Sequence, residues 1–171
     1  MVQSSSAITL DFEDLSGSGA LPGNYAGLTW TDWNYYDSYQ PPYHASSGAQ
    51  RIYNQFGVVP TLQFGQDVTF IGAWMAGYGY DQYFEGYNNG VKIFESAHIP
   101  STGMPFGQYF NLNWVGVDEI RIQSWSGNYY IIDDLQYRTD LQPSGVPDAG
   151  STLLLLGSAL SVLGVVRRRS A

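Results

Sequence analysis

The chain has 171 residues, no cysteine and a formal net charge of −8 at pH 7. Residues 1–145 hold 14 of the 15 acidic residues against four of the seven Lys and Arg residues, so their formal charge is −10. We expect no nucleic-acid binding from them, because a nucleic-acid partner requires a basic face. The absence of cysteine excludes disulfides, thiolate metal sites and Cys nucleophiles.

Short segments of alternating apolar and polar residues follow one another through most of the chain, separated by turn residues. About nine such segments at roughly ten-residue spacing are typical of an antiparallel β-sheet protein. The expected strands are Ile8 to Phe12, Leu28 to Trp33, Gln50 to Phe56, Thr61 to Phe64, Val68 to Trp74, Tyr80 to Tyr87, Val91 to Ser96, Gln108 to Trp114, Glu119 to Trp125 and Tyr129 to Tyr137.

Turn and loop signals refine this pattern. The Asn89-Gly90 step predicts a hairpin, and Pro41-Pro42 predicts a long loop over residues 34–48. We expect residues 1–140 to form one all-β domain, an antiparallel β-sandwich of jelly-roll type whose first and last strands pair. A closed barrel is the alternative. Residues 141–145 are the expected linker.

Residues 146–171 have a different character. An uncharged apolar run from Thr152 to Val166 ends at Arg167, Arg168 and Arg169. As a helix the run spans about 22 Å, or about 27 Å counted from Ala149, which crosses a slightly thinned bilayer. This predicts a single C-terminal transmembrane helix with the arginines on the cytoplasmic side. The alternative is a buried C-terminal helix of a soluble domain.

The motif before this run is Val146-Pro147-Asp148-Ala149-Gly150. Together with the apolar run and the arginines, it resembles the VPDSG variant of the PEP-CTERM sorting signals, with Ala149 in place of Ser. The resemblance implies processing by an exosortase near the motif, a Gram-negative-type bacterium and an association with exopolysaccharide. The expected location is the cell surface or extracellular matrix, after transient anchoring in the inner membrane.

Export also requires a signal peptide, and residues 1–7 carry neither a charged nor an apolar region of that kind. Either the signal peptide has been removed from this sequence, or the start is assigned too late. A chain that is not exported would contradict the sorting interpretation.

A second resemblance lies in the domain itself. Four short motifs, in this order, resemble the jelly-roll, carbohydrate-module-like domains that often precede such tails. They are Phe12-Glu13-Asp14-Leu15, Gly27-Leu28-Thr29-Trp30, Gly116-Val117-Asp118-Glu119-Ile120 and Ile132-Asp133-Asp134-Leu135.

Three of these motifs carry adjacent acids, and a structural calcium ion is the expected use of the acids in the first and last motifs. Glu13 or Asp14 would share the ion with Asp133 or Asp134 if the first and last strands are neighbours. Solvated strand ends are the simpler alternative. Adjacent carboxylates on a strand point to opposite faces, so these pairs do not by themselves form a glycosidase site.

Aromatic residues cluster in two regions and suggest a glycan-binding surface, because aromatic rings stack on sugar faces. The candidates are Trp33, Tyr35 and Tyr36 in the first region and Tyr80 and Tyr83 in the second. The alternative is that the tryptophans fill the core and the tyrosines line sheet surfaces. His44 and His98 are isolated, and no catalytic motif is present.

We therefore expect an exported, exosortase-processed, non-enzymatic protein of the bacterial surface or extracellular matrix. Its expected partners are the exosortase, extracellular polysaccharide and, through the tail, the inner membrane. Two alternatives remain open at this point: a glycan-binding module with structural calcium, and a polysaccharide-active hydrolase. No cofactor is expected apart from that calcium ion.

Overall fold

The computed structural model describes residues 6–139. These residues form ten β-strands and two short 3-10 turns, with no α-helix in this range. The elements are β1 (Ile8–Leu10), β2 (Gly19–Ala20), η1 (Tyr25–Gly27), β3 (Thr29–Thr31), β4 (Trp33–Tyr36), β5 (Arg51–Asn54), β6 (Thr61–Tyr78), β7 (Tyr83–Asn88), β8 (Val91–Glu95), β9 (Pro105–Gln123), η2 (Trp125–Gly127) and β10 (Tyr130–Arg138).

All paired strands of this range are antiparallel. Their order is β2-β4-β5-β10-β6-β9-β7-β8, with β1 added to β10 and β3 to β6. Within the described residues β2 and β8 end this order without pairing to each other, so the sheet is open and the barrel alternative is wrong. The first and last strands pair as expected, with Ile8 opposite Tyr137. The predicted hairpin is also confirmed, because Asn88 lies opposite Val91 across the Asn89-Gly90 turn.

Two pairs of predicted strands are each one long strand. Thr61 to Phe64 and Val68 to Trp74 are parts of β6, and the two segments around Gly116 are parts of β9. Gly65 and Gly116 have φ of +71° and +78°, and the register between β6 and β9 shifts between Gln63 and Val68. The glycines therefore mark bulges that bend continuous strands, whereas the sequence pattern suggested turns.

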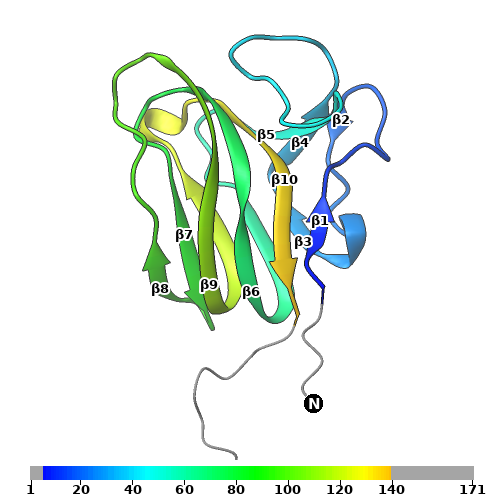
Figure 1. The fold of residues 1–171 in the computed structure, drawn as a ribbon, viewed down its shortest axis with the longest axis vertical. Helices are drawn as coiled ribbons and strands as arrows, with labels where there is room; N and C mark the ends of the chain where they lie inside the picture. The colour runs from blue at the N-terminus through cyan, green and yellow to red at the C-terminus, as the bar shows by residue number, and fades with distance from the viewer. Residues whose placement is uncertain (1–5, 140–171) are drawn as a thin grey trace, which may run out of the picture. The chain divides into compact units, whose positions relative to one another are not determined.

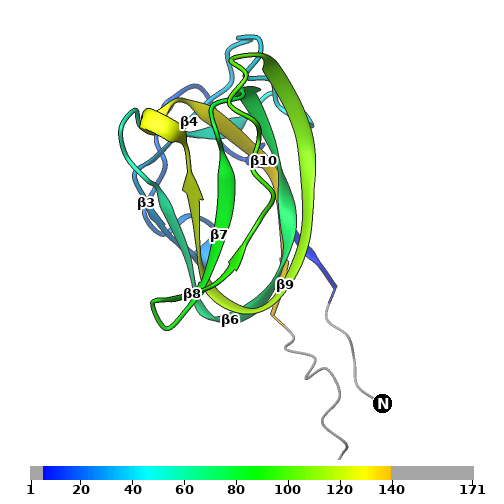
Figure 2. The ribbon, with the colours of Figure 1, turned by 90° about the vertical axis from the view of Figure 1, so that its left-hand side faces the viewer.

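Bending lets the sheet face itself across a core. Figures 1 and 2 show β6 and β9 curving through the whole domain. Phe84 of β7 pairs with Ile122 near the end of β9, yet its ring lies 5.0 Å from the ring of Phe110 near the start of β9. Phe94 of β8 likewise stacks on Trp114 at 5.3 Å. The two halves of the bent sheet are therefore facing layers, with aromatic rings packed between them.

The predicted linker and sorting tail lie outside the described residues. This applies to residues 141–145, to the motif Val146 to Gly150, to the expected transmembrane helix and to Arg167, Arg168 and Arg169. Within residues 6–139 no helix is long and apolar enough to cross a membrane.

Candidate glycan-binding site

A long loop, residues 37–50, connects β4 to β5 at the upper end of the domain as drawn in Figure 1. The Arg51 side chain, only 2% exposed, holds it in place. Its guanidinium donates hydrogen bonds to the backbone carbonyls of Tyr43 and Ala49, both at 2.7 Å, and to that of Ser38. The same group lies 3.8 Å from the centre of the Tyr36 ring. One buried cation therefore fixes the loop at three points.

Two of the predicted calcium ligands fix the same loop from another side. Glu13 Oε1 accepts hydrogen bonds from the backbone N–H groups of Ala49 and Gln50, at 2.8 and 2.7 Å. Gly48 has φ of +51°, and a Cβ there would lie 2.2 Å from the Glu13 carboxyl carbon. The approach of Glu13 to the loop therefore requires glycine at this position.

Asp133 binds the loop in the same way. Its Oδ2 accepts hydrogen bonds from the N–H groups of Ser46 and Ser47, at 2.8 and 3.0 Å, and its Oδ1 accepts one from Asp134 N–H. Burial raises the pKa of Asp133 to about 6, against the opposing effect of these three amides. At neutral pH the carboxylate is ionised and holds the loop by charge-assisted hydrogen bonds.

The other two predicted calcium ligands, Asp14 and Asp134, each form a separate local hydrogen bond. Asp14 accepts a hydrogen bond from the Tyr25 hydroxyl at 2.5 Å, and Asp134 accepts one from the Ser47 hydroxyl at 2.9 Å. Within residues 6–139 no group of three or more Asp, Glu or His side chains is placed to hold a metal ion. The four acids are thus divided between a loop clamp and local hydrogen bonds.

Between this loop and strands β4, β5 and β10 lies a cleft of about 330 Å³. The Tyr36 and Tyr53 rings meet edge to face at 5.1 Å, and the Tyr53 and Tyr129 rings lie 6.4 Å apart. Phe56 extends this row of rings at the rim, 5.7 Å from Tyr129. We call this the tyrosine cleft; its lining residues are Ser18, Tyr36, Ser38, Gln40, Tyr43, Tyr53, Tyr129, Tyr130 and Ile131.

The lining of the tyrosine cleft contains neither a carboxylate nor a histidine. Burial raises the pKa of Tyr36 and of Tyr43, so both phenols are neutral at physiological pH. The Tyr36 hydroxyl donates to the Tyr43 carbonyl at 3.2 Å, whereas Tyr129 is 45% exposed. The cleft therefore offers aromatic faces with neutral hydroxyl and amide groups, and no acid–base pair.

Of the three aromatic candidates in the first region, only Tyr36 lines the cleft. Trp33 is 5% exposed and its Nε1–H donates to the Thr61 carbonyl at 2.9 Å, while Tyr35 packs against the core. The prediction of Trp33 and Tyr35 as surface contacts is therefore wrong. A loop was expected from residue 34, but residues 33–36 form strand β4, and alternation along this strand turns Trp33 and Tyr35 inward.

The two candidates of the second region do not line the cleft either. Tyr80 has its ring 6.4 Å from that of Tyr78, and Tyr83 stacks flat on His98 at 3.8 Å. Three tyrosines of the cleft, Tyr43, Tyr53 and Tyr129, are not among the residues predicted from the sequence. The alternation of buried Ile52 with Tyr53 was a usable signal, since it places Tyr53 on the outer side of β5.

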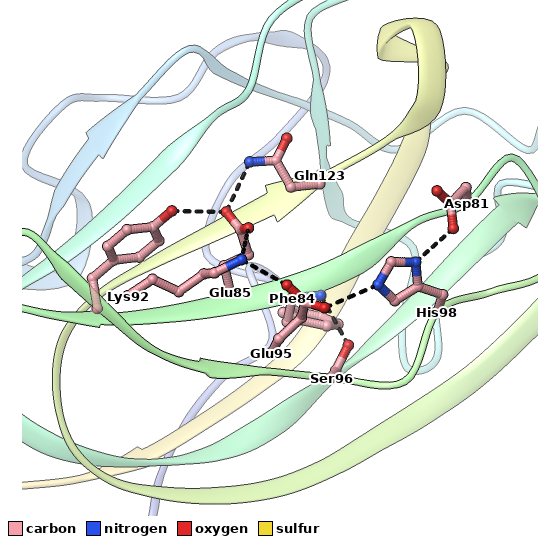
Figure 3. A network of polar contacts seen from close by, with 9 residues as sticks. Asp81, Phe84, Glu85, Lys92, Glu95, Ser96, His98 and Gln123 are labelled. Atoms are coloured by element: carbon pink, nitrogen blue, oxygen red, sulfur yellow. Dashed lines mark hydrogen bonds and ion pairs between the residues drawn. The ribbon is translucent and has the colours of Figure 1, made fainter.

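A second polar region lies on strands β7, β8 and β9 (Figure 3). Glu85 accepts hydrogen bonds from Gln123 at 2.8 Å, Lys92 at 3.0 Å and Tyr87 at 2.9 Å. Burial acts to raise the pKa of Glu85, but these three donors outweigh it and the pKa lies below its usual value. We call these groups, with the His98 contacts below, the charged network.

His98 has a carboxylate at each ring nitrogen. Nδ1 lies 2.7 Å from Asp81 and Nε2 lies 3.3 Å from Glu95, as Figure 3 shows. The hydrogen bond with Asp81 is the main cause that raises the pKa of His98. His98 was expected to be an isolated surface residue, but the fold of the β8–β9 connection brings it between two acids.

A second cavity of about 430 Å³ has only polar or glycine lining. Three of its acids already accept hydrogen bonds: Asp67 from Asn88, Asp118 from Asn89 N–H and Glu119 from Gln63. Its lining residues are Gln63, Gly65, Gln66, Asp67, Asn89, Gly90, Asp118 and Glu119.

Residues 145–170 match the sequence profile of the VPDSG-CTERM motif. The chain carries a VPDSG-CTERM sorting signal. The match includes Ala149 and confirms the resemblance noted from residues 146–150. A comparison with curated proteins finds no significant match.

Among solved structures, the K2 cleaved adhesin domain of Lys-gingipain is similar with a TM-score of 0.50 and 17% identity, over 78% of this chain and 100% of that one. The K1 cleaved adhesin domain of Lys-gingipain from Porphyromonas gingivalis W83 gives 0.47 and 10%, over 80% and 99%. TmCBM61, solved with β-1,4-galactotriose, gives 0.38 and 13%, over 68% and 91%. At these identities the likeness to the K2 domain concerns the fold alone.

Proposed function

We propose that this is an exported, non-enzymatic protein of the bacterial surface or extracellular matrix, and that its domain, a β-sandwich of jelly-roll type, binds polysaccharide in the tyrosine cleft. The observation that carries this proposal is the row of aromatic rings of Tyr36, Tyr53 and Tyr129 along one open cleft. The VPDSG-CTERM sorting signal supports export.

The chemistry of the cleft suits a carbohydrate. Aromatic faces stack on the apolar faces of sugar rings, while phenol and amide groups exchange hydrogen bonds with sugar hydroxyls. The volume of about 330 Å³ lies at the lower end of the range of small-ligand sites, roughly 300 to 1,000 Å³. The absence of carboxylate and histidine from the lining favours binding over hydrolysis.

The tail would act as follows. Residues 149–166 would form the membrane helix, Arg167, Arg168 and Arg169 would hold its end in the cytoplasm, and an exosortase would cut near Pro147 and Asp148. Mass spectrometry of the C-terminus of surface-released protein tests this step. Protein released with an intact Arg cluster would contradict processing.

Binding is tested by a glycan array, using the mature protein released from the producing cell. Tyr129→Ala removes an exposed ring of the cleft and should weaken binding about tenfold, the effect of roughly one lost stacking contact. Tyr83→Ala is the matched control, because its ring stacks on His98 away from the cleft lining. Equal binding by wild type and Tyr129→Ala, or loss in Tyr83→Ala alone, would contradict the assignment.

We also propose that the domain binds a structural calcium ion, and one observation supports this. The side-chain Oε1 of Gln50 is buried without a hydrogen-bond partner, next to the backbone N–H that binds Glu13. This oxygen is of the kind that Ca²⁺ prefers as a ligand. Calcium chloride should raise the melting temperature relative to EDTA, and Glu13→Gln should remove that difference. An unchanged melting temperature would contradict the site.

A further inference from the structure

Arg51 is a buried cation without a carboxylate partner in the described part of the chain. Its three acceptors are backbone carbonyls, which carry partial charges only, and its remaining close contact is the Tyr36 ring. By contrast, Lys92 is within 3.0 Å of Glu85 and 2.7 Å of Glu95, and Arg121 forms an ion pair with Glu119. The full positive charge of Arg51 is therefore not offset by a paired anion.

This charge lies directly behind the wall of the tyrosine cleft. The three groups that contact the guanidinium on this side belong to Tyr36, Ser38 and Tyr43, and all three residues line the cleft. A charge behind a single layer of protein interacts more strongly than it would across water, because the intervening medium has a lower effective dielectric constant. Arg51 therefore makes a positive contribution to the potential inside the cleft.

The acids near the loop are bound to backbone amides rather than to Arg51. Asp37 is adjacent in sequence to Tyr36 and Ser38, but its carboxylate accepts a hydrogen bond from Gly17 N–H at 3.1 Å. Glu13 and Asp133 are each bound to backbone amides of residues 46–50. None of these three acids lines the cleft. The cleft thus combines aromatic stacking surfaces with a cation at its back.

We propose that the tyrosine cleft selects acidic sugars, those that carry a carboxylate on or next to the ring, over neutral sugars of the same shape. This inference rests on the proposed glycan binding and names its ligand class. Arg51 acts here as a specificity-determining residue through space, while the tyrosines supply the stacking that both kinds of sugar share.

Two matched pairs of probes test this directly. The acids are oligogalacturonate and oligomannuronate. Each is compared with its own methyl ester, which has the same sugar ring but no charge. Calorimetric titration of the surface-released protein at low salt should give about tenfold tighter binding of at least one acid than of its ester, the order expected for one charge at short range. The ratio should fall as sodium chloride is added.

Variants then locate the source of the preference. Arg51→Gln should bring acid and ester to equal affinity, whereas Lys92→Gln, which removes the same charge from the charged network, should leave the ratio unchanged. If Arg51→Gln fails to fold, the acid-to-ester ratio of the wild type and its dependence on salt still decide the question. Binding of the ester as tightly as the acid overturns the acidic-sugar inference and leaves glycan binding standing. Binding of neither probe, with no binding on a wider glycan array, overturns both.

Discussion

The tyrosine cleft and the charged network use polar residues on the outer sides of the same sheet in opposite ways. In the charged network Lys92 lies beside Glu85 and Glu95, and His98 lies between Asp81 and Glu95. At the tyrosine cleft the cation is buried under a loop and the exposed groups are neutral. A surface whose charges are satisfied internally has little left to offer a ligand. A surface whose rings and hydroxyls are free is the better binding site.

The largest expected difference between the tyrosine cleft and the charged network is the loss of stability when the cation of each is removed. Arg51→Gln breaks three hydrogen bonds that hold residues 37–50, so the free energy of unfolding should fall by about 3 kcal/mol. Lys92→Gln removes a solvent-accessible cation and should cost much less, because exposed ion pairs contribute little to stability. Urea denaturation of both variants measures the difference. Equal losses would show that Arg51 does not hold the loop.

Two glycines give the next comparison. Gly48→Ala places a Cβ against the Glu13 carboxyl at a positive φ and should cost about 2 to 3 kcal/mol. Gly90→Ala, in the β7–β8 turn, meets the same backbone strain at φ of +75° with nothing within 4 Å of the added Cβ, so about 1 kcal/mol is expected. Thermal unfolding of both proteins is the measurement. A smaller loss at Gly48 would contradict the Glu13 clamp.

Asp133 should make the loop clamp sensitive to pH. Its pKa is raised in the folded protein to about 6, above the usual value of 3.8, so folding favours its protonated form. The free energy of unfolding is therefore highest below pH 4 and falls by about 2 kcal/mol as the pH rises through 6, because burial of the ionised carboxyl costs more than its three amide hydrogen bonds return. Denaturation of wild type and Asp133→Asn across this range tests it. The free energy of unfolding should fall between pH 4 and 6 in wild type but not in the variant. The same pH dependence in both proteins would contradict the assignment.

His98 should act in a higher and separate pH window, with a smaller effect. Its pKa is raised by its contact with Asp81, so the stability it contributes is present below pH 6.5 and is lost as the pH rises through the folded-state pKa. His98→Gln should flatten the stability curve above pH 6.5 and leave the range from pH 4 to 6 unchanged. NMR titration of the His98 ring in wild type gives its pKa directly. A pKa at or below 6.5 would contradict the ion pairs with Asp81 and Glu95.

The sequence was sufficient for those parts of the fold that depend on local patterns. Alternating apolar residues predicted most of the strands, and the Asn89-Gly90 step located the β7–β8 turn. Long strands that bend at Gly65 and Gly116 were not predicted, because a bulge and a turn have the same local signal. The pairing of β1 with β10 followed from an expectation about the fold type rather than from any residue.

The site was predicted less well, for a physical reason. Tyr36 lies on β4, Tyr53 on β5 and Tyr129 just before β10, and the pairing of these three strands brings them together. Arg51 gives no sign in the sequence that it is buried, since its acceptors are carbonyls of a loop that folds back over it. Glu13 and Asp133 were recognised as belonging together. Their shared task, binding the amides of residues 46–50, depends on the path of that same loop.

The central claim is that the tyrosine cleft is the binding surface of this protein. The most direct test is an NMR titration of the surface-released protein with oligosaccharides prepared from the matrix of the producing cell. We expect shifts of the amide signals of Tyr36, Tyr43, Tyr53 and Tyr129, with those of Glu85, Lys92 and His98 unchanged. Shifts confined to the charged network, or none at saturating oligosaccharide, would contradict it.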